Sequence, residues 1–282
     1  MLRIALAQQH CTPDRTDNLQ RALLAMERAR DLGAELIVFP ELAIDRFFPQ
    51  HERLAEAAKL AEPIPGPSTE KVARKARECR LVTVFNLYEK DDRSGGRYYD
   101  SSPVFDADGE LLGVTRMVHI TDYACFHEKA YYHPGDRGAP VYATRVGRVG
   151  VAICYDRHYP EYMRALALNG AELVAIPQAG AVGEWPEGLF EAEVRTAAFQ
   201  NGYFAALCNR VGREEKLTFA GESFVVDPEG QVVVRGKSQE DDLIIADLDL
   251  ARCAGSTAKR LFWRDRRPEL YREWFGLGSD SV

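Results

Sequence analysis

Residues 149–161, with the sequence Val-Gly-Val-Ala-Ile-Cys-Tyr-Asp-Arg-His-Tyr-Pro-Glu, carry the pattern that decides the fold. Val149 to Ile153 are apolar or glycine, which is typical of a strand buried on both faces. Pro160 stands where a first helical turn favours proline, and Glu161 adds the negative charge that a helix N-terminus favours. The order is therefore strand, sharp turn and helix, with Cys154 at the carboxyl edge of a sheet.

A cysteine in this position is a candidate nucleophile. Free backbone N–H groups and the positive end of a helix dipole both lower a thiol pKa toward the reactive thiolate. The simpler interpretation is that Cys154 is a small buried hydrophobic residue, as many free cysteines are.

A second reactive side chain follows another buried strand. Residues 35–39 (Glu-Leu-Ile-Val-Phe) form that strand, and Pro40-Glu41 end it. Sites in open α/β sheets form at the carboxyl ends of strands. Glu41 and Cys154 can therefore act as base and nucleophile if the sheet brings them together. A glutamate in this place is also typical of a charge in the first turn of a helix.

The rest of the chain predicts an α/β protein. Apolar periodicity indicates helices near residues 16–33, 68–78, 160–169 and 185–201, which alternate with buried strands. Residues 121–138 are long, aromatic and irregular, and loops of this kind are usually functional or mobile. We see no repeat and no linker that would divide the chain, so we expect one domain over residues 1–282.

Composition excludes several classes of protein. Apolar residues make up 46% of the 282 residues, which is enough for a sizeable core, and the net charge of −7 argues against nucleic-acid binding. Six cysteines without a C-x-x-C pair are typical of reduced thiols in a cytoplasmic protein. We expect neither a signal peptide nor a membrane span. Histidine spacing predicts no metal site, and the absence of a G-x-G-x-x-G motif or P-loop predicts no nucleotide cofactor.

Several motifs together resemble the nitrilase superfamily of carbon–nitrogen hydrolases, on its carbamoylase side. They are Pro40-Glu41, residues 154–161, Asn-Arg-Val-Gly at 209–212 and Asp-Arg-Arg-Pro-Glu-Leu-Tyr at 265–271. The resemblance covers almost the whole chain and implies a four-layer α-β-β-α sandwich. It also implies a homodimer or higher homo-oligomer, with a core of about residues 1–250 and an extension of about residues 251–282 at a subunit interface.

The resemblance assigns roles to residues that match the family's motifs. It implies Cys154 as nucleophile, Glu41 as general base, and Glu128 as a further active-site glutamate. The backbone N–H of Tyr155 would be one oxyanion donor. Together they predict a cofactor-free hydrolysis of a C–N bond in a small N-carbamoyl or amide compound, such as N-carbamoyl-β-alanine, through a covalent acyl-enzyme.

Arg157 indicates which class of substrate the protein would bind. Family members that act on N-carbamoyl amino acids place an arginine here to hold a carboxylate, and a guanidinium suits a carboxylate because it forms two parallel hydrogen bonds. The alternative is a surface arginine paired with Glu161. Asp156 is better interpreted as a residue that supports the site or caps the helix than as a catalytic one.

One departure from the family puts the activity in question. The pattern Gly-x-x-Arg-Lys-x-His-Ile is kept at residues 113–120 except that Met117 replaces the catalytic lysine. Loss of one oxyanion donor typically costs about 10²–10³ in rate. Three interpretations follow: another cation, from Arg116, His119 or Lys129, replaces the lysine; the enzyme works without one; or the protein only binds metabolites or partners. Arg116 would point to the other face of a regular strand.

Overall fold

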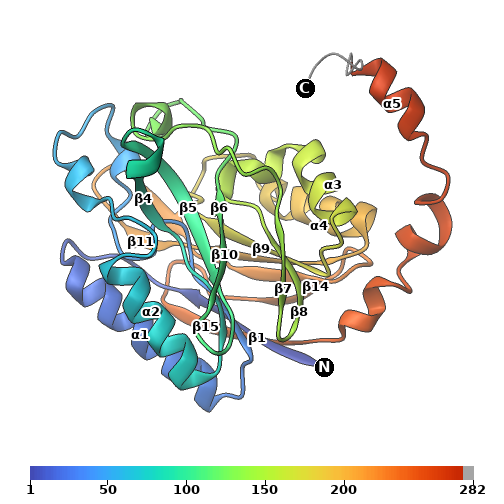
Figure 1. Cartoon of the computed structure of the whole chain (residues 1–282), viewed down its shortest axis with the longest axis horizontal. Helices are drawn as coiled ribbons and strands as arrows, with labels where there is room; N and C mark the ends of the chain where they lie inside the picture. Colours follow the sequence, from blue (N-terminus) through green and yellow to red (C-terminus); the bar gives the residue numbers. More distant parts are fainter. Residues whose placement is uncertain (276–282) are drawn as a thin grey trace.

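The computed structural model describes residues 1–275. Two β-sheets pack face to face, and helices cover the outer face of each sheet (Figure 1). The architecture is therefore the predicted α/β type, a four-layer α-β-β-α sandwich. Among the described residues, no helix combines the length and apolar character needed to cross a membrane.

The first sheet has seven strands, six from the amino-terminal half of the chain and β15 from its carboxyl-terminal part. Its order is β15-β1-β2-β3-β5-β4, and β6 pairs with β5. β1, β2 and β3 are parallel, so the carboxyl ends of β1 and β2 meet at the same edge. The bounds are Leu2–Gln8 (β1), Leu36–Val38 (β2), Val82–Val84 (β3), Leu87–Asp91 (β4), Arg97–Phe105 (β5), Leu111–Arg116 (β6) and Asp242–Leu248 (β15).

The second sheet has six strands in the order β14-β13-β10-β9-β8-β7, with β8, β9 and β10 parallel. The bounds are Val141–Thr144 (β7), Gly147–Val151 (β8), Leu173–Gln178 (β9), Phe204–Asn209 (β10), Phe224–Val226 (β13) and Val232–Arg235 (β14). Val211–Arg213 (β11) and Thr218–Ala220 (β12) form a separate two-stranded sheet.

Helices bury one face of each sheet. α1 (Arg15–Asp31) and α2 (Pro67–Cys79) cover the first sheet, and α3 (Pro160–Leu168) and α4 (Leu189–Asn201) cover the second. Three apolar clusters result, one under each helical layer and one between the sheets. Because both faces of each sheet are covered, the central strands are mostly apolar, and the polar side chains among them, such as Asp100 and Gln178, are buried.

Several predicted boundaries were wrong. The strand before Cys154 ends at Val151, two residues earlier than predicted, and the residues from 81 to 88 form two strands rather than one. Helix α4 starts at Leu189 instead of residue 185, since residues 179–188 form a loop. A continuous run of apolar residues shows that a segment is buried, but it does not show where backbone pairing stops.

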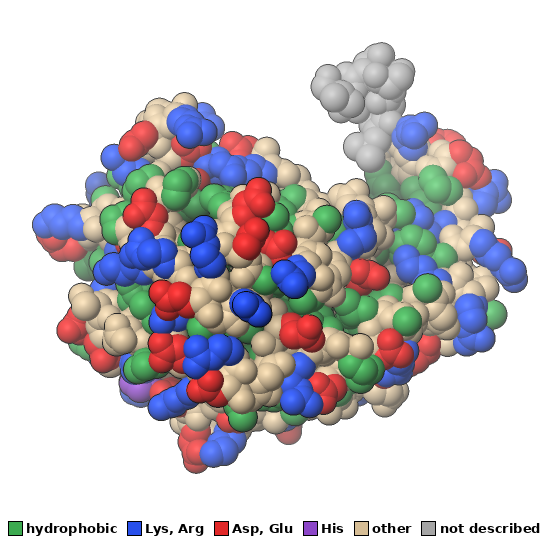
Figure 2. Space-filling model, turned by 60° about the horizontal axis from the view of Figure 1, so that its bottom comes forward, with side chains coloured by type: hydrophobic (Ala, Val, Ile, Leu, Met, Phe, Trp, Pro, Cys, Tyr) green, Lys and Arg blue, Asp and Glu red, His purple; other side chains and the backbone are tan. Residues whose placement is uncertain are grey.

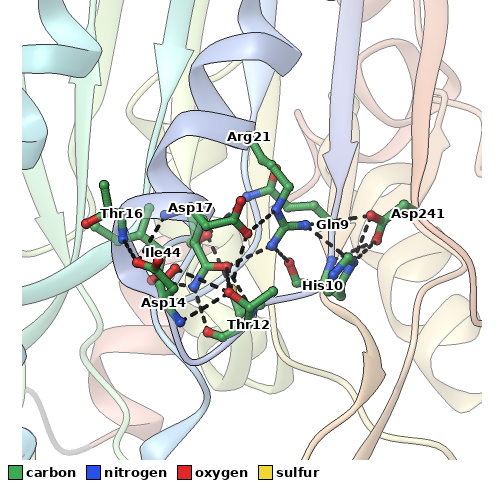
Figure 3. Close-up of polar contacts among 12 residues, drawn as sticks. Gln9, His10, Thr12, Asp14, Thr16, Asp17, Arg21, Ile44 and Asp241 are labelled. Atoms are coloured by element: carbon green, nitrogen blue, oxygen red, sulfur yellow. Dashed lines mark hydrogen bonds and ion pairs between the residues drawn. The ribbon is translucent and has the colours of Figure 1, made fainter.

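A polar network fixes the loop after β1 (Figure 3). Asp14 caps α1 by accepting a hydrogen bond from the Thr16 amide, and His10 Nδ1 lies 2.8 Å from an oxygen of Asp241. Asn18 of α1 donates a hydrogen bond to the carbonyl of Ile44 over 3.0 Å. The helix therefore holds the segment that follows Glu41.

The carboxyl-terminal segment leaves the body of the molecule. It ends in α5 (Pro268–Trp274), which lies away from both sheets and has no buried residue (Figure 1). The side chains of Trp274 and Phe275 are 67% and 63% exposed. Part of the predicted extension, residues 276–282, lies outside the described residues. Elsewhere, acidic and basic side chains are interspersed over the face in Figure 2.

Candidate active site

Cys154, Glu41 and Glu128 meet between the two sheets. Cys154 Sγ and one carboxyl oxygen of each glutamate all lie within 4.8 Å of one another, and all three residues are buried. Glu41 follows β2 of the first sheet, whereas Cys154 follows β8 of the second. The site is thus assembled from strand ends that are 113 positions apart in the chain.

The backbone at Cys154 is held in an unusual conformation. Its φ is +43°, in the left-handed region that residues with a side chain rarely adopt. A short 3₁₀-helix, Cys154–His158, starts there and leads into α3. Backbone strain of this kind persists only where the surrounding structure imposes it, and it is common at active sites.

Gln178 contacts the sulfur directly. It is the last residue of β9, next to β8, and its Nε2 donates a hydrogen bond to Cys154 Sγ over 3.2 Å. A donor aimed at sulfur favours the thiolate over the thiol. The residue was not predicted, although its place at the carboxyl end of a buried strand gave the same signal as that of Cys154.

Two side chains, those of Arg210 and Asn86, fix the backbone of the loop that contains Glu41 and Leu42 (the Glu41 loop). Arg210 Nη1 donates to the carbonyl of Glu41 over 2.8 Å and to that of Leu42 over 2.6 Å. Asn86 Oδ1 accepts a hydrogen bond from the Leu42 amide over 2.6 Å. Neither side chain was predicted to act here, although Arg210 lies in one of the quoted motifs.

Glu128 opens a second short 3₁₀-helix, Glu128–Ala130, inside the long irregular segment. Its Oε2 accepts a hydrogen bond from the Thr121 amide over 3.4 Å, and no described donor reaches Oε1. A buried carboxyl oxygen without a donor is available to a proton, a substrate group or a water molecule.

Burial dominates the electrostatics of this cluster. Burial and then the charge of Glu128 raise the pKa of Glu41 to about 8. Burial and then the charges of Glu41 and Glu128 raise the pKa of the Cys154 thiol well above its ordinary value. The predicted lowering of the thiol pKa was therefore wrong for the resting protein, because desolvation and two carboxyls outweigh the helix terminus. The thiol needs a base to ionise.

Met117, which stands in place of the family lysine, is fully buried. Its amide donates to the carbonyl of Asp100, opposite it on β5. Arg116 points to the other face, as predicted, where it pairs with Glu89 at 2.6 Å and Asp91 at 2.7 Å.

Of the two other proposed replacements for the lysine, one is paired with an acid and the other is exposed to solvent. His119 Nδ1 lies 2.7 Å from Asp156, and its ring stacks on Tyr159 with centroids 3.5 Å apart. Lys129 is exposed to solvent. Arg116 and His119 are each paired with an acid, and the charge of Arg157 lowers the pKa of the Cys154 thiol against the larger effects of burial, Glu41 and Glu128.

Arg157 is not the surface residue of the alternative interpretation. It is buried and pairs with Glu193 at 3.4 Å rather than with Glu161. Its Nη1 donates to the Cys154 carbonyl over 2.9 Å and to Gln178 Oε1 over 3.0 Å. No described acceptor lies within hydrogen-bond distance of Nη2, so this donor is free for a ligand.

Asp156 supports the turn that contains Cys154. Its carboxyl accepts from the amide of His119 over 3.0 Å and more weakly from the amide of Ile153 over 3.4 Å. It thereby ties the segment after β6 to the residue before Cys154. The interpretation of Asp156 as a supporting residue agrees with these contacts.

A cavity of about 340 Å³ shares Gln178 with the site, although none of Cys154, Glu41 and Glu128 lines it. Gln178 and Phe190 line it, and the Phe190 ring lies 4.4 Å from the guanidinium of Arg157. Three acidic residues also contribute to its wall: Glu187, Glu191 and Glu222.

The cluster is also a donor set that a divalent cation accepts. One thiol and two carboxyls within 4.8 Å can bind such an ion when deprotonated. Histidine spacing did not reveal this set, because no histidine belongs to it. A chelator is therefore a necessary control for any activity of this site.

Comparison with known proteins finds one matching family and several relatives. The sequence matches the family described as carbon-nitrogen hydrolase over residues 3–257. It is 32% identical over 299 residues to N-carbamoylputrescine amidase of Solanum lycopersicum, covering 100% of this chain and 98% of that protein. It is 34% identical over 229 residues to beta-ureidopropionase of Arabidopsis thaliana, covering 76% of this chain and 56% of the relative.

The fold matches that of a solved amidase. A mutant of the amidase from Nesterenkonia sp. AN1 aligns with a TM-score of 0.81 and 28% identity, covering 97% of this chain and 96% of the other. That structure shows covalent addition of the acetamide moiety of fluoroacetamide at the active site cysteine.

Proposed function

Because this chain belongs to the carbon–nitrogen hydrolase family, we propose that it hydrolyses a C–N bond of a small N-carbamoyl compound through a covalent intermediate on Cys154. One observation carries the proposal: Cys154 Sγ and the carboxyls of Glu41 and Glu128 lie within 4.8 Å of one another in a buried site. This spacing suits proton transfer between nucleophile and base.

The first half of the reaction forms the covalent bond. Glu41 takes the proton of the Cys154 thiol as the sulfur attacks the carbamoyl carbon. The N–H of Tyr155 and the amide of Gln178 are the donors that would stabilise the developing negative charges on oxygen and sulfur. Glu41 then gives its proton to the leaving nitrogen, so that ammonia departs and a thiocarbamate remains on the enzyme.

The second half restores the free thiol. Glu41 takes a proton from a water molecule that Glu128 Oε1 helps to orient, and the resulting hydroxide attacks the thiocarbamate. The C–S bond breaks, and the sulfur regains a proton from Glu41. The released carbamic acid decomposes to the amine and carbon dioxide. Glu41 thus moves one proton in each direction and is unchanged at the end.

Arg157 favours a carboxylate on the substrate, such as that of N-carbamoyl-β-alanine. Nη1 donates to Cys154 and Gln178 and Nε pairs with Glu193, so among the described residues Nη2 is the donor that remains free for a ligand. Phe190 stacks on the guanidinium and restricts its orientation. A charge-assisted hydrogen bond at a buried arginine contributes about 1.5–3 kcal/mol.

A second candidate is an N-carbamoyl compound with a cationic tail. Glu187 and Glu222 in the wall of the cavity next to Gln178 favour it, because they would attract an ammonium group, whereas Glu191 there is already paired with Arg235. The similarity to an N-carbamoylputrescine amidase also favours this second candidate. A plain amide or nitrile is the remaining enzymatic alternative, since the thiol chemistry is shared.

Ammonia release from N-carbamoyl-β-alanine and from N-carbamoylputrescine tests the proposal, with Cys154→Ala as control and with and without a chelator. We expect release with the wild-type protein alone and no effect of chelation. Mass spectrometry of quenched reactions should find an adduct on the peptide that contains Cys154. Absence of turnover and of adduct with every substrate would favour a homologue that only binds.

We also propose a homo-oligomer in the cytoplasm. The exposed aromatic residues of α5 suit a protein interface, and all six cysteines are free thiols, which suits a reducing compartment.

A further inference from the structure

The Asp-Arg-Arg-Pro-Glu-Leu-Tyr motif at residues 265–271 has no role in the reaction above. The chain reaches it through a short π-helix, Ala258–Phe262, beside the end of α4. Trp263 fixes this part of the chain, because its Nε1 donates a hydrogen bond to the carbonyl of Gln200 in α4 over 3.0 Å. The chain leaves the body of the molecule only after this point, toward α5 (Figure 1).

Three basic side chains gather on the ring of Trp263. The Nζ of Lys259 lies 3.2 Å from the ring centroid, and the guanidinium carbons of Arg164 and Arg266 lie 5.1 and 5.3 Å from it. They come from the π-helix, from α3 and from the motif, and each is partly buried. An aromatic face attracts a cation, but one neutral ring does not balance three positive charges. These four residues, the Trp263 cluster, are therefore short of negative charge.

Other arginines near the motif have acidic partners. Arg264 pairs with Asp265 at 3.8 Å, and Arg267 pairs with Glu269. By contrast, no acid among residues 1–275 forms an ion pair with a cation of the Trp263 cluster. The excess of positive charge is therefore local to the cluster.

Most donors of the cluster are also unused. Arg164 Nη1 donates to the carbonyl of Gln200 over 3.0 Å, and no other side-chain N–H of the three cations has an acceptor among the described residues. Burial and then the charge of Arg164 lower the pKa of Lys259, and burial and then the charge of Arg266 lower the pKa of Arg164. The cations repel one another, and an anion placed among them would relieve this repulsion.

We propose that the Trp263 cluster binds a phosphate group, either as inorganic phosphate or on a small phosphorylated compound. Guanidinium and ammonium groups suit phosphate, because their charge-assisted hydrogen bonds to it are short and strong. A groove of about 360 Å³ between α3 and α4 is lined by Arg164 and Gln200, so a compound that carries the phosphate has room beside the cluster. The catalytic residues take no part, and the proposal does not rest on the hydrolysis proposed above.

Isothermal titration calorimetry of the full chain with inorganic phosphate and with phenyl phosphate tests the proposal, at an ionic strength held constant with sodium chloride. Both should bind, and the tighter of the two identifies the source of the group. Arg266→Gln removes one cation and keeps a polar side chain, so each Kd should rise by about tenfold to a hundredfold. Arg264→Gln is the matched control, since it removes an arginine of the same segment that is paired with Asp265, and its Kd values should stay close to those of the wild type.

A folded wild-type protein that binds neither compound overturns the proposal, and so do equal losses of affinity in Arg264→Gln and Arg266→Gln. Should Arg266→Gln fail to fold, Lys259→Met takes its place with the same expected rise in Kd. If carboxylates of a second copy fill the cluster instead, the wild type binds no phosphate and Lys259→Met lowers the molar mass measured by light scattering, which also overturns the proposal. Binding is measured without a C–N substrate, so missing turnover bears on the hydrolysis alone.

Discussion

The side-chain amide of Gln178 donates a hydrogen bond to the sulfur of Cys154 over 3.2 Å, from the neighbouring strand of the same sheet. The same side chain accepts from Arg157 through Oε1. One glutamine therefore connects the nucleophile with the cation whose charge acts on it. The acids Glu41, Asp100 and Glu128 come from the first sheet and the segment after it, so donors and acids approach the thiol from opposite sides.

Replacing Gln178 by leucine should weaken the nucleophile. The variant keeps a similar side-chain volume and removes the donor to sulfur, so the alkylation profile of Cys154 should move to higher pH. We expect kcat to fall by about tenfold to a hundredfold, less than for a full oxyanion donor. Stopped assays of ammonia release and alkylation kinetics measure both effects. An unchanged alkylation profile would show that the hydrogen bond does not stabilise the thiolate.

Met117→Lys should raise the rate if the site lacks a cation. The ammonium would lie beside Asp100, on the face toward Glu41, where opposite charges offset its desolvation and favour the thiolate. We expect a gain in kcat of about tenfold or more. Met117→Leu is the matched control, since such swaps are usually tolerated. A lower rate in a lysine variant that still folds would mean that the pocket is built around methionine.

Arg157→Gln should separate the two substrate candidates. KM for N-carbamoyl-β-alanine should rise by about tenfold to a hundredfold, because a charge-assisted hydrogen bond is lost. KM for N-carbamoylputrescine should change much less. Glu193→Gln removes the ion-pair partner of Arg157 and leaves the guanidinium in place, so it controls for disturbance of the pair. Equal effects of Arg157→Gln on both substrates would contradict a role as carboxylate clamp.

Arg210→Met should destabilise the protein. Arg210 and Glu214 are 1% and 3% exposed, and removing one partner of a buried pair costs about 3–5 kcal/mol. Thermal unfolding should show a fall in Tm of roughly 6–20 °C. The double variant Arg210→Met/Glu214→Leu should recover part of it. Disrupting the exposed Arg3–Asp247 pair should change Tm far less, and an equal loss there would refute the argument.

Stability should fall as pH rises toward 8. Glu41 has a folded-state pKa raised to about 8, so the folded state favours its neutral form. Its contribution is fully present below the unfolded pKa, near 4.5, and is lost as pH rises through 8. The glutamine side chain in Glu41→Gln is neutral at every pH. The free energy of unfolding of this variant should therefore fall by roughly 3–5 kcal/mol less between pH 5 and pH 9 than that of the wild type. Chemical denaturation at both values measures this, and parallel losses would contradict it.

The sequence predicted the parts of the site that local patterns encode. Glu41 and Cys154 end buried strands, and this alone marked them, while strand alternation predicted that Arg116 faces away from the site. Asp100 carried no such signal, since an acid inside a strand is typical of a solvent-exposed face. The direction in which the thiol pKa shifts could not be predicted either, because it depends on two carboxyls that tertiary packing brings to the sulfur from distant segments.

The base and the nucleophile belong to different sheets, and no covalent or ladder hydrogen bond runs directly between β2 and β8. Their separation is set by apolar contacts across the middle layer of the sandwich and by Arg210, which follows β10 of the second sheet and donates to the carbonyls of Glu41 and Leu42. A slide of one sheet against the other by a few ångströms would leave secondary structure intact and part the acid from the sulfur. Catalytic activity therefore depends on how the two sheets are aligned. Substitutions deep in the layer between them can lower the rate at a smaller loss of stability than is needed to unfold the protein.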